Sequence, residues 1–350
     1  MTAARSVCLA LAFTAAAIAP VATSALSAER IVTDSAGRRV AVPERIERIF
    51  AAGPPAAIMV YTLAPDLLIG WTSATRPAEA EFMPPRYAQL PALGRLTGRG
   101  STANPEVVLQ TKPDIVLDYG SVRPTFVSLA DRVQEQTRVP YLLLDGSLVT
   151  LPAAYRLLGN IVGIRDRADF LAQRAEAILG DVTAKVATVP RDKRPRVYYG
   201  RGPRGLETGL SGSINTEIIE YVGAINVAAE GAGPGGLANV SIEQVLRWNP
   251  DVVLTTDPTF YRTAFEDPLW RALPAVEKRQ VFLSPALPFG WIDFPPSSNR
   301  LIGVVWLAHL LFPELFPGDV RKAARDFYLT FLHVELTDAQ LDRLLAGAVR

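Results

Sequence analysis

The sequence predicts an α/β protein of two Rossmann-like lobes, each with a mostly parallel sheet, joined by a single long helix. Strand-like and helix-like segments alternate in both halves, a long helical stretch separates the halves, and one twelve-residue motif occurs in each. The 350 residues, 49% of them hydrophobic, are enough for two globular units. We expect an N-terminal lobe over 29–148, a bridging helix over 149–190 and a C-terminal lobe over 191–350.

Residues 1–28 have the features of a cleaved export signal. Arg5 precedes an apolar run from Val7 to Ala22, and small residues follow the run. The run is short for a membrane span and contains Pro20, which favours cleavage over anchoring. Cys8 lies inside the run rather than at the cleavage point, so we do not expect lipidation. We therefore expect a periplasmic protein.

The elements of the first half follow from periodicity and turn residues. A polar stretch at 30–49 has the alternation and the glycine turn of a hairpin. Beyond it, apolar runs bounded by turn residues alternate with segments of helical spacing. The expected strands are 46–51, 67–71, 115–118 and 141–145, and the expected helices are 56–63, 105–111 and 125–137.

The second half begins after a helical stretch over 152–187 that Pro190 and Pro195 end. The same alternation then restarts. The expected strands are 196–199, 252–255 and 281–283, and the expected helices are 215–222, 242–248 and 300–312, with a charged helical tail from Val320.

A repeat links the two halves. Glu106–Leu117 and Glu243–Leu254 both read E-x-V-L-x-x-x-P-D-x-V-L. The pattern predicts a short helix with a glutamate near its N-terminus, a Pro-Asp break and a buried strand. Each glutamate alone also fits helix capping. Together, Glu106 and Glu243 would present two exposed carboxylates to arginines of a two-fold partner.

This order of segments resembles the periplasmic binding proteins of ABC importers for ferric siderophores, haem and cobalamin. The resemblance covers residues 48–316. It is carried by RIFAAGPPAAIMVYTLAPDLLIGW, NPEVVLQTKPDIVLDYG, the helical bridge, TEIIEYVGAINVA, VSIEQVLRWNPDVVLTT and PPSSNRLIGVVWLAHLLFPE. It implies two lobes on one rigid helix, no catalysis, and delivery of a small-molecule metal chelate to an ABC permease dimer. The resemblance also implies that Glu106 and Glu243 meet permease arginines. We expect a monomer.

The ligand is expected at the carboxyl ends of the strands, where the two lobes would form a cleft. The loops there are rich in Arg, Tyr and Trp, which suit an oxygen-rich anionic chelate. Core packing of the aromatic residues and solvation of the arginines are the alternatives. The candidates are Pro54, Arg76, Tyr119, Tyr199, Arg201, Tyr261, Arg262 and Trp291. Tyr199, Arg201 and Trp291 rank first because they lie at or just beyond expected strand ends.

Composition excludes several other classes. The net charge of +1 argues against nucleic-acid binding. The chain has two histidines, His309 and His333, and its single cysteine lies in the export signal, so we expect no metal site and no cofactor. A bound metal should arrive inside its own chelator, with Fe(III) in a siderophore as the leading case.

Several alternatives stay open. The ligand could be haem, cobalamin, or a molybdate or tungstate oxyanion held by the glycine- and serine-rich segments at 212–215 and 231–236. A sensory or adaptor protein would use the same lobes. A secreted hydrolase is a further class, although the segment Gly209–Ser213 lacks the last glycine of a nucleophile elbow.

Overall fold

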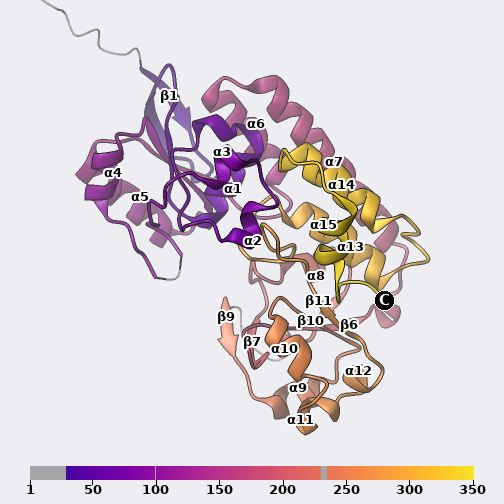
Figure 1. Cartoon of the computed structure of the whole chain (residues 1–350). Coiled ribbons are helices and arrows are strands. Elements are labelled where there is room, and N and C mark those ends of the chain that lie inside the picture. Colours follow the sequence, from indigo (N-terminus) through magenta and orange to yellow (C-terminus); the bar gives the residue numbers. More distant parts are fainter. Residues whose placement is uncertain (1–28, 99, 230–234) are drawn as a thin grey trace, which may run out of the picture.

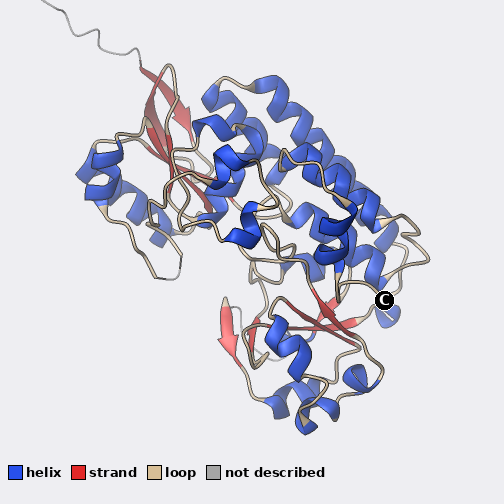
Figure 2. Ribbon diagram, viewed as in Figure 1, coloured by secondary structure: helices blue, strands red, loops and turns tan. Residues whose placement is uncertain are grey.

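Each half of the chain forms an α/β unit around a parallel sheet, as the alternation predicted (Figures 1 and 2). The computed structural model describes residues 29–98, 100–229 and 235–350. The expected export signal lies outside these residues. Within the described part, no helix combines the length and the hydropathy of a membrane span.

The N-terminal lobe contains a hairpin and a three-stranded parallel sheet. The hairpin pairs β1 (Glu29–Thr33) with β2 (Arg39–Pro43), and the sheet has the order β3 (Ile49–Ala51), β4 (Ile115–Gly120), β5 (Tyr141–Asp145). Its helices are α1 (Pro54–Leu63), α2 (Pro77–Ala80), α3 (Pro85–Ala88), α4 (Pro105–Thr111) and α5 (Pro124–Thr137).

The expected strand at 67–71 is wrong. A 3-10 turn, η1 (Pro65–Leu67), leads into single β-bridges from Leu68 to Ile49 and from Trp71 to Ala92. Leu68 and Trp71 of this run are buried, but the backbone of the run does not form a continuous ladder of strand hydrogen bonds.

The helical stretch between the lobes contains two helices, α6 (Leu151–Val162) and α7 (Arg165–Val186). Gly163 ends α6 in the left-handed region at φ 76°, a conformation that favours glycine. A Cβ added to Gly159 would lie 2.2 Å from that of Ala168, so the two helices pack closely. The 22-residue α7 is the long helix that joins the lobes, and Tyr221 of the second lobe donates a hydrogen bond to the carbonyl of Leu179 on α7 (3.0 Å).

The C-terminal lobe contains the parallel sheet β11 (Val281–Leu283), β10 (Val252–Thr255), β6 (Arg196–Gly200), β8 (Ile225–Asn226) and an antiparallel pair, β7 (Glu207–Gly209) with β9 (Leu237–Asn239). Two 3-10 turns are η2 (Arg191–Lys193) and η3 (Val227–Ala229). The helices are α8 (Glu217–Tyr221), α9 (Ile242–Trp248), α10 (Pro258–Thr263), α11 (Pro268–Arg271), α12 (Pro274–Glu277), α13 (Arg300–Leu311), α14 (Val320–Phe331) and α15 (Asp338–Leu345).

The two repeat units have matching local structures. Asn104 and Ser241 cap α4 and α9 with their side chains, and both helices end at a left-handed residue, Lys112 (φ 46°) and Asn249 (φ 44°). The prolines that follow end both helices.

The aspartates of the repeat join each helix to the first strand of its sheet. Oδ2 of Asp114 accepts the Arg48 N–H at 2.8 Å, and Oδ2 of Asp251 accepts the Arg196 N–H at 2.8 Å. Arg48 and Arg196 also donate to carbonyls at the C-terminal ends of α4 and α9. The two repeat units are therefore equivalent in backbone and in side-chain bonding, although the lobes differ in their number of strands.

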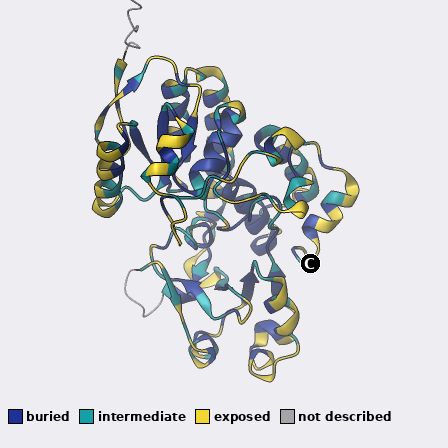
Figure 3. Cartoon of the chain, turned by 60° about the vertical axis from the view of Figure 1, so that its left-hand side comes forward, coloured by how far each residue is buried: buried dark blue, intermediate teal, exposed yellow. Residues whose placement is uncertain are grey.

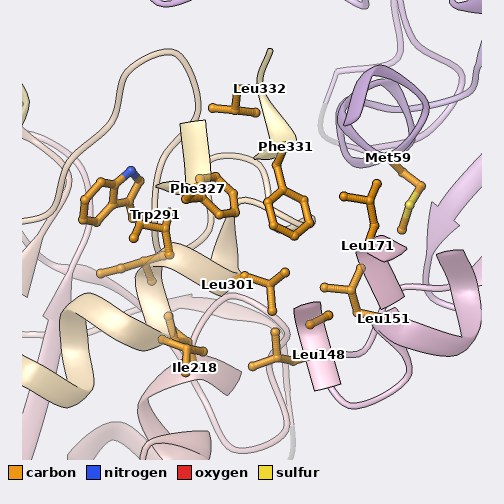
Figure 4. Close-up of a cluster of buried hydrophobic side chains, with 14 of the residues drawn as sticks. Met59, Leu148, Leu151, Leu171, Ile218, Trp291, Leu301, Phe327, Phe331 and Leu332 are labelled. Atoms are coloured by element: carbon orange, nitrogen blue, oxygen red, sulfur yellow. The ribbon is translucent and has the colours of Figure 1, made fainter. Parts of the chain in front are cut away.

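One apolar cluster runs through both lobes (Figures 3 and 4). It joins Met59 of α1 and Leu171 of α7 to Ile218 of α8, Leu301 of α13 and Phe331 of α14. Helices α13, α14 and α15 thus pack between the lobes. Gln340 on α15 also donates a hydrogen bond to the Glu81 carbonyl of the N-terminal lobe at 2.6 Å.

Candidate ligand-binding site

A cleft of about 1220 Å³ lies at the carboxyl ends of the strands of both sheets. Its N-lobe wall includes Pro54 after β3 and residues 120–123 after β4, and its C-lobe wall includes Arg201 after β6 and residues 256–258 after β10. The cleft therefore lies where the strand order predicts it. Residues 231–234, part of the segment that could hold an oxyanion in the alternative interpretation, lie outside the described residues.

The eight candidate ligand residues divide into two groups. Pro54, Arg76, Tyr119 and Arg201 line the cleft, whereas Tyr199, Tyr261, Arg262 and Trp291 do not.

Burial removes Tyr199 and Trp291 from the cleft surface, because both side chains are completely enclosed. Trp291 lies in the shared apolar cluster, where its indole N–H donates to the Tyr328 hydroxyl at 3.3 Å (Figure 4). Trp71 is a tryptophan that does line the cleft.

Helix α10 turns Tyr261 and Arg262 away from the cleft. Tyr261 packs against the ring of Phe265 at 5.7 Å, and Arg262 is exposed with its Nε donating to the Pro258 carbonyl at 3.3 Å. Pro258, at the N-terminus of the helix, is the α10 residue that lines the cleft.

Arg201 is held by two carboxylates. It forms ion pairs with Glu207 and with Asp293, where Nε lies 3.0 Å from Oδ2, and its side chain is only 8% exposed. Asp293 also accepts from the Tyr199 hydroxyl (2.5 Å) and from the Asn215 amide (2.9 Å). Burial raises the pKa of Asp293, and Arg201 opposes that shift. Because its charge is already balanced, Arg201 is a poor partner for a ligand anion.

Tyr119 lies in the cleft wall, but its side chain is as enclosed as those of Tyr199 and Trp291. Its hydroxyl is buried and lies close to the guanidinium of Arg300. Burial raises the pKa of this phenol well above its usual value, and Arg300 opposes that shift. The Tyr119 hydroxyl therefore does not reach the cleft surface.

Asp118, the residue before Tyr119, also lines the cleft and was not expected from the sequence. Its carboxyl accepts from the hydroxyls of Thr97 (3.3 Å) and Tyr141 (3.2 Å), and burial raises its pKa to about 6. The sequence pattern marked this position only as the end of a buried strand.

Buried Arg300 and partly exposed Glu217 form an ion pair in the C-terminal lobe, and both bond to the N-terminal lobe at the cleft. Arg300 of α13 donates to Glu217 of α8 at 2.7 Å and to the Gly146 carbonyl after β5 at 2.6 Å. Glu217 in turn accepts the Leu148 N–H at 3.0 Å. These contacts span long sequence separations, so local pattern gave no signal for them.

The free positive charge of the cleft is in the N-terminal lobe. Arg76 pairs with Glu79 at 2.5 Å, whereas Arg95 and Arg123 have no ion pair with a carboxylate among the described residues.

The opposite wall of the cleft carries an exposed aromatic side chain, because Phe294 lines that wall and is 50% exposed.

The sequence profile of the family described as periplasmic binding protein matches residues 62–287, and the chain belongs to this family. It is 28% identical over 328 residues to the molybdate-binding protein MolA of Haemophilus influenzae, covering 87% of this chain and 91% of that protein. A cobalamin-binding protein of Halobacterium salinarum is 28% identical over 232 residues, 63% of this chain and 57% of that protein.

Solved structures agree in fold. An ABC transporter solute-binding protein from Sulfurospirillum deleyianum has a TM-score of 0.82 and 30% identity, covering 91% of this chain and 99% of that chain. MolA bound to molybdate has a TM-score of 0.72 and 25% identity, covering 88% and 99%. The protein is therefore an exported substrate-binding protein of the ABC-transporter type and not an enzyme, which removes the hydrolase alternative.

Proposed function

We propose that the protein captures a bulky anionic metal chelate, with a ferric siderophore as the leading case, and delivers it to an ABC permease. The observation that carries this proposal is the size of the cleft, about 1220 Å³. Pockets for drug-sized molecules are typically about 300–1,000 Å³. A bare oxyanion would fill a small part of this space.

The lining of the cleft supports an organic ligand with anionic oxygens. Arg95 and Arg123 supply donors, and the proline and phenylalanine residues of both walls supply apolar surface. Helices α1, α5 and α10 all begin with proline near the cleft. Because proline has no N–H, these termini offer fewer backbone donors to a bare oxyanion.

Molybdate or tungstate is the second candidate, and the similarity to MolA over 87% of the chain favours it. The cleft also has hydroxyl side chains suited to an oxyanion. They include Thr72, Ser73, Thr75, Ser121, Ser147 and Ser213.

A ligand panel tests the proposal. Purified protein is titrated with a ferric tris-hydroxamate, a ferric tris-catecholate, haem, cobalamin, molybdate and tungstate, with calorimetry and tryptophan fluorescence, to which Trp71 of the cleft contributes, as readouts. Sub-micromolar binding of a ferric chelate supports the proposal. Tight binding of molybdate alone contradicts the chelate proposal and supports the second candidate, an oxyanion-binding function.

The Arg123→Gln variant locates the ligand. Arg123 is exposed and lines the cleft, and we expect its loss to weaken binding about 5-fold to 10-fold without reducing the free energy of unfolding. Arg132→Gln is the matched control, because Arg132 is exposed on α5 outside the cleft lining. It should leave affinity unchanged; equal effects of both variants on affinity contradict the placement.

We further propose that Glu106 and Glu243 dock on permease arginines, that residues 1–28 are cleaved on export, and that the protein acts as a monomer. Both glutamates are exposed and lie in the first turns of α4 and α9, on separate lobes (Figure 1). A hydrogen bond from the Ser241 hydroxyl lowers the pKa of Glu243, which keeps it ionised.

The double variant Glu106→Arg and Glu243→Arg tests the docking. We expect import in cells carrying the permease to be lost while ligand affinity stays unchanged, because like charges would meet at the contact. Glu135→Arg, at an exposed position of α5, should import normally. Normal import by the double variant would exclude this docking mode. If the unmodified protein binds a ligand but supports no import, a sensory role is favoured instead.

A further inference from the structure

Phe294 stands out among the apolar residues of the cleft. It lines the C-lobe wall, and half of its surface (50%) is exposed to solvent. Exposed phenyl surface forgoes the stabilisation that burial would give. A large aromatic face left open in a binding cleft is a surface for a ligand.

The backbone around Phe294 is held in place. The Gly290 N–H donates to the Phe294 carbonyl at 2.6 Å, and the Asn299 amide donates to the Pro295 carbonyl at 3.0 Å. A Cβ on Gly290 would lie 2.9 Å from that of Phe294, so the loop is tightly closed. On the other side, Asp293 is anchored by Tyr199 and Asn215. The ring is therefore presented by a preorganised loop.

Arg201 covers one face of the ring. Its guanidinium carbon lies 4.6 Å from the ring centroid, and the ion pairs with Glu207 and Asp293 hold it there. A cation on one face draws π-electron density toward itself. The opposite face becomes less negative and thus a better surface for an electron-rich ring.

We propose that Phe294, backed by Arg201, is a stacking platform that selects chelators carrying a flat, electron-rich ring, the catecholate class. This inference rests on the proposed function, because it names which chelates the cleft prefers. Hydroxamates and oxyanions lack such a ring and gain nothing from the platform.

The test measures Kd for a ferric tris-catecholate, a ferric tris-hydroxamate and molybdate with the unmodified protein and three variants. Phe294→Ala removes the platform, Phe294→Leu keeps apolar surface without a ring, and Leu269→Ala removes a comparably exposed side chain (54%) on α11. We expect Phe294→Ala to weaken catecholate binding about 10-fold and Phe294→Leu to restore only part of it. The affinity of any other bound ligand, and all affinities of Leu269→Ala, should not change.

Unchanged catecholate affinity in Phe294→Ala, equal weakening of every ligand, or full recovery in Phe294→Leu overturns the platform. Binding of a hydroxamate or molybdate without any catecholate overturns it as well and leaves the transport role intact. If the unmodified protein binds no member of the panel, the proposed function fails together with the inference.

Discussion

The burial of each polar side chain determines what it does near the cleft. Asp118 and Asp293 are both enclosed, yet Asp293 has a cation beside it and Asp118 has only hydroxyl donors. Desolvation therefore dominates at Asp118 and raises its pKa to about 6. Such a carboxylate destabilises the fold at neutral pH, which fits a position kept for ligand contact.

The Asp118→Asn variant tests this cost. In the folded protein Asp118 binds its proton up to about pH 6, above the usual value of about 3.9 in the unfolded chain. Its stabilising contribution is therefore complete below about pH 4 and is lost as the pH rises through 6. We expect Asp118→Asn to raise the free energy of unfolding at pH 7 by up to roughly 3 kcal/mol and by little at pH 4.

Urea denaturation at several pH values between these limits measures the difference. Asp192→Asn, at an exposed position, should show no such pH dependence. A gain for Asp118→Asn that is the same at every pH would rule out titration as its source.

Helix α13 packs behind the loop 290–295, which carries Phe294 into the C-lobe wall of the cleft. Gly303 of this helix lies against the backbone of the loop, and a Cβ there would be 1.9 Å from the Trp291 carbonyl oxygen. Gly180 of α7 is the opposite case, because it is exposed and a Cβ there meets nothing within 4 Å.

Two glycine variants should therefore act in opposite directions. Gly303→Ala forces the helix away from the loop and should cost about 3 kcal/mol of unfolding free energy. Gly180→Ala should gain about 0.5–1 kcal/mol, since alanine has the higher helix propensity. Chemical denaturation measures both, and a neutral Gly303→Ala would show that the helix and loop are not in close contact.

At the scale of the whole molecule, the lobes are joined by polar contacts as well as by α7. Arg300 is fully buried, and Ser297 just before it donates to the Pro55 carbonyl of α1 at 2.8 Å. Glu217 adds a bond to the segment after β5, where it accepts the Leu148 N–H, and it also pairs with Arg300. Together these hydrogen bonds connect the two walls of the cleft.

Breaking the Arg300–Glu217 pair, which supports these cross-lobe bonds, should weaken the whole fold. Glu217→Gln leaves the buried charge of Arg300 uncompensated, and we expect a loss of about 3 kcal/mol. Glu176→Gln breaks the exposed pair with Arg156 and should cost much less. Equal losses in thermal and urea unfolding would mean that the buried pair contributes no more than a surface pair.

Much of the fold was predictable because its signals are local. Helix α9 and strands β5, β10 and β11 lie at their expected bounds, since caps, prolines and apolar runs act over a few residues. The break between α6 and α7 differs from the single helix expected, because a glycine within a helical pattern is either tolerated or used as a C-cap and the local pattern does not distinguish the two cases.

The sequence by itself determined the two-lobe architecture, the equivalence of its halves and the location of the cleft at the strand ends. Only the tertiary structure decided which side chains reach that cleft. Tyr199 and Arg201 lie at the end of the same strand, yet the first is enclosed and the second lines the cleft beside the buried Asp293. Periodicity locates the end of a strand, whereas packing partners far along the chain decide the burial and the electrostatic surroundings of the side chains at that end, as Asp293 does for Tyr199 and Arg201.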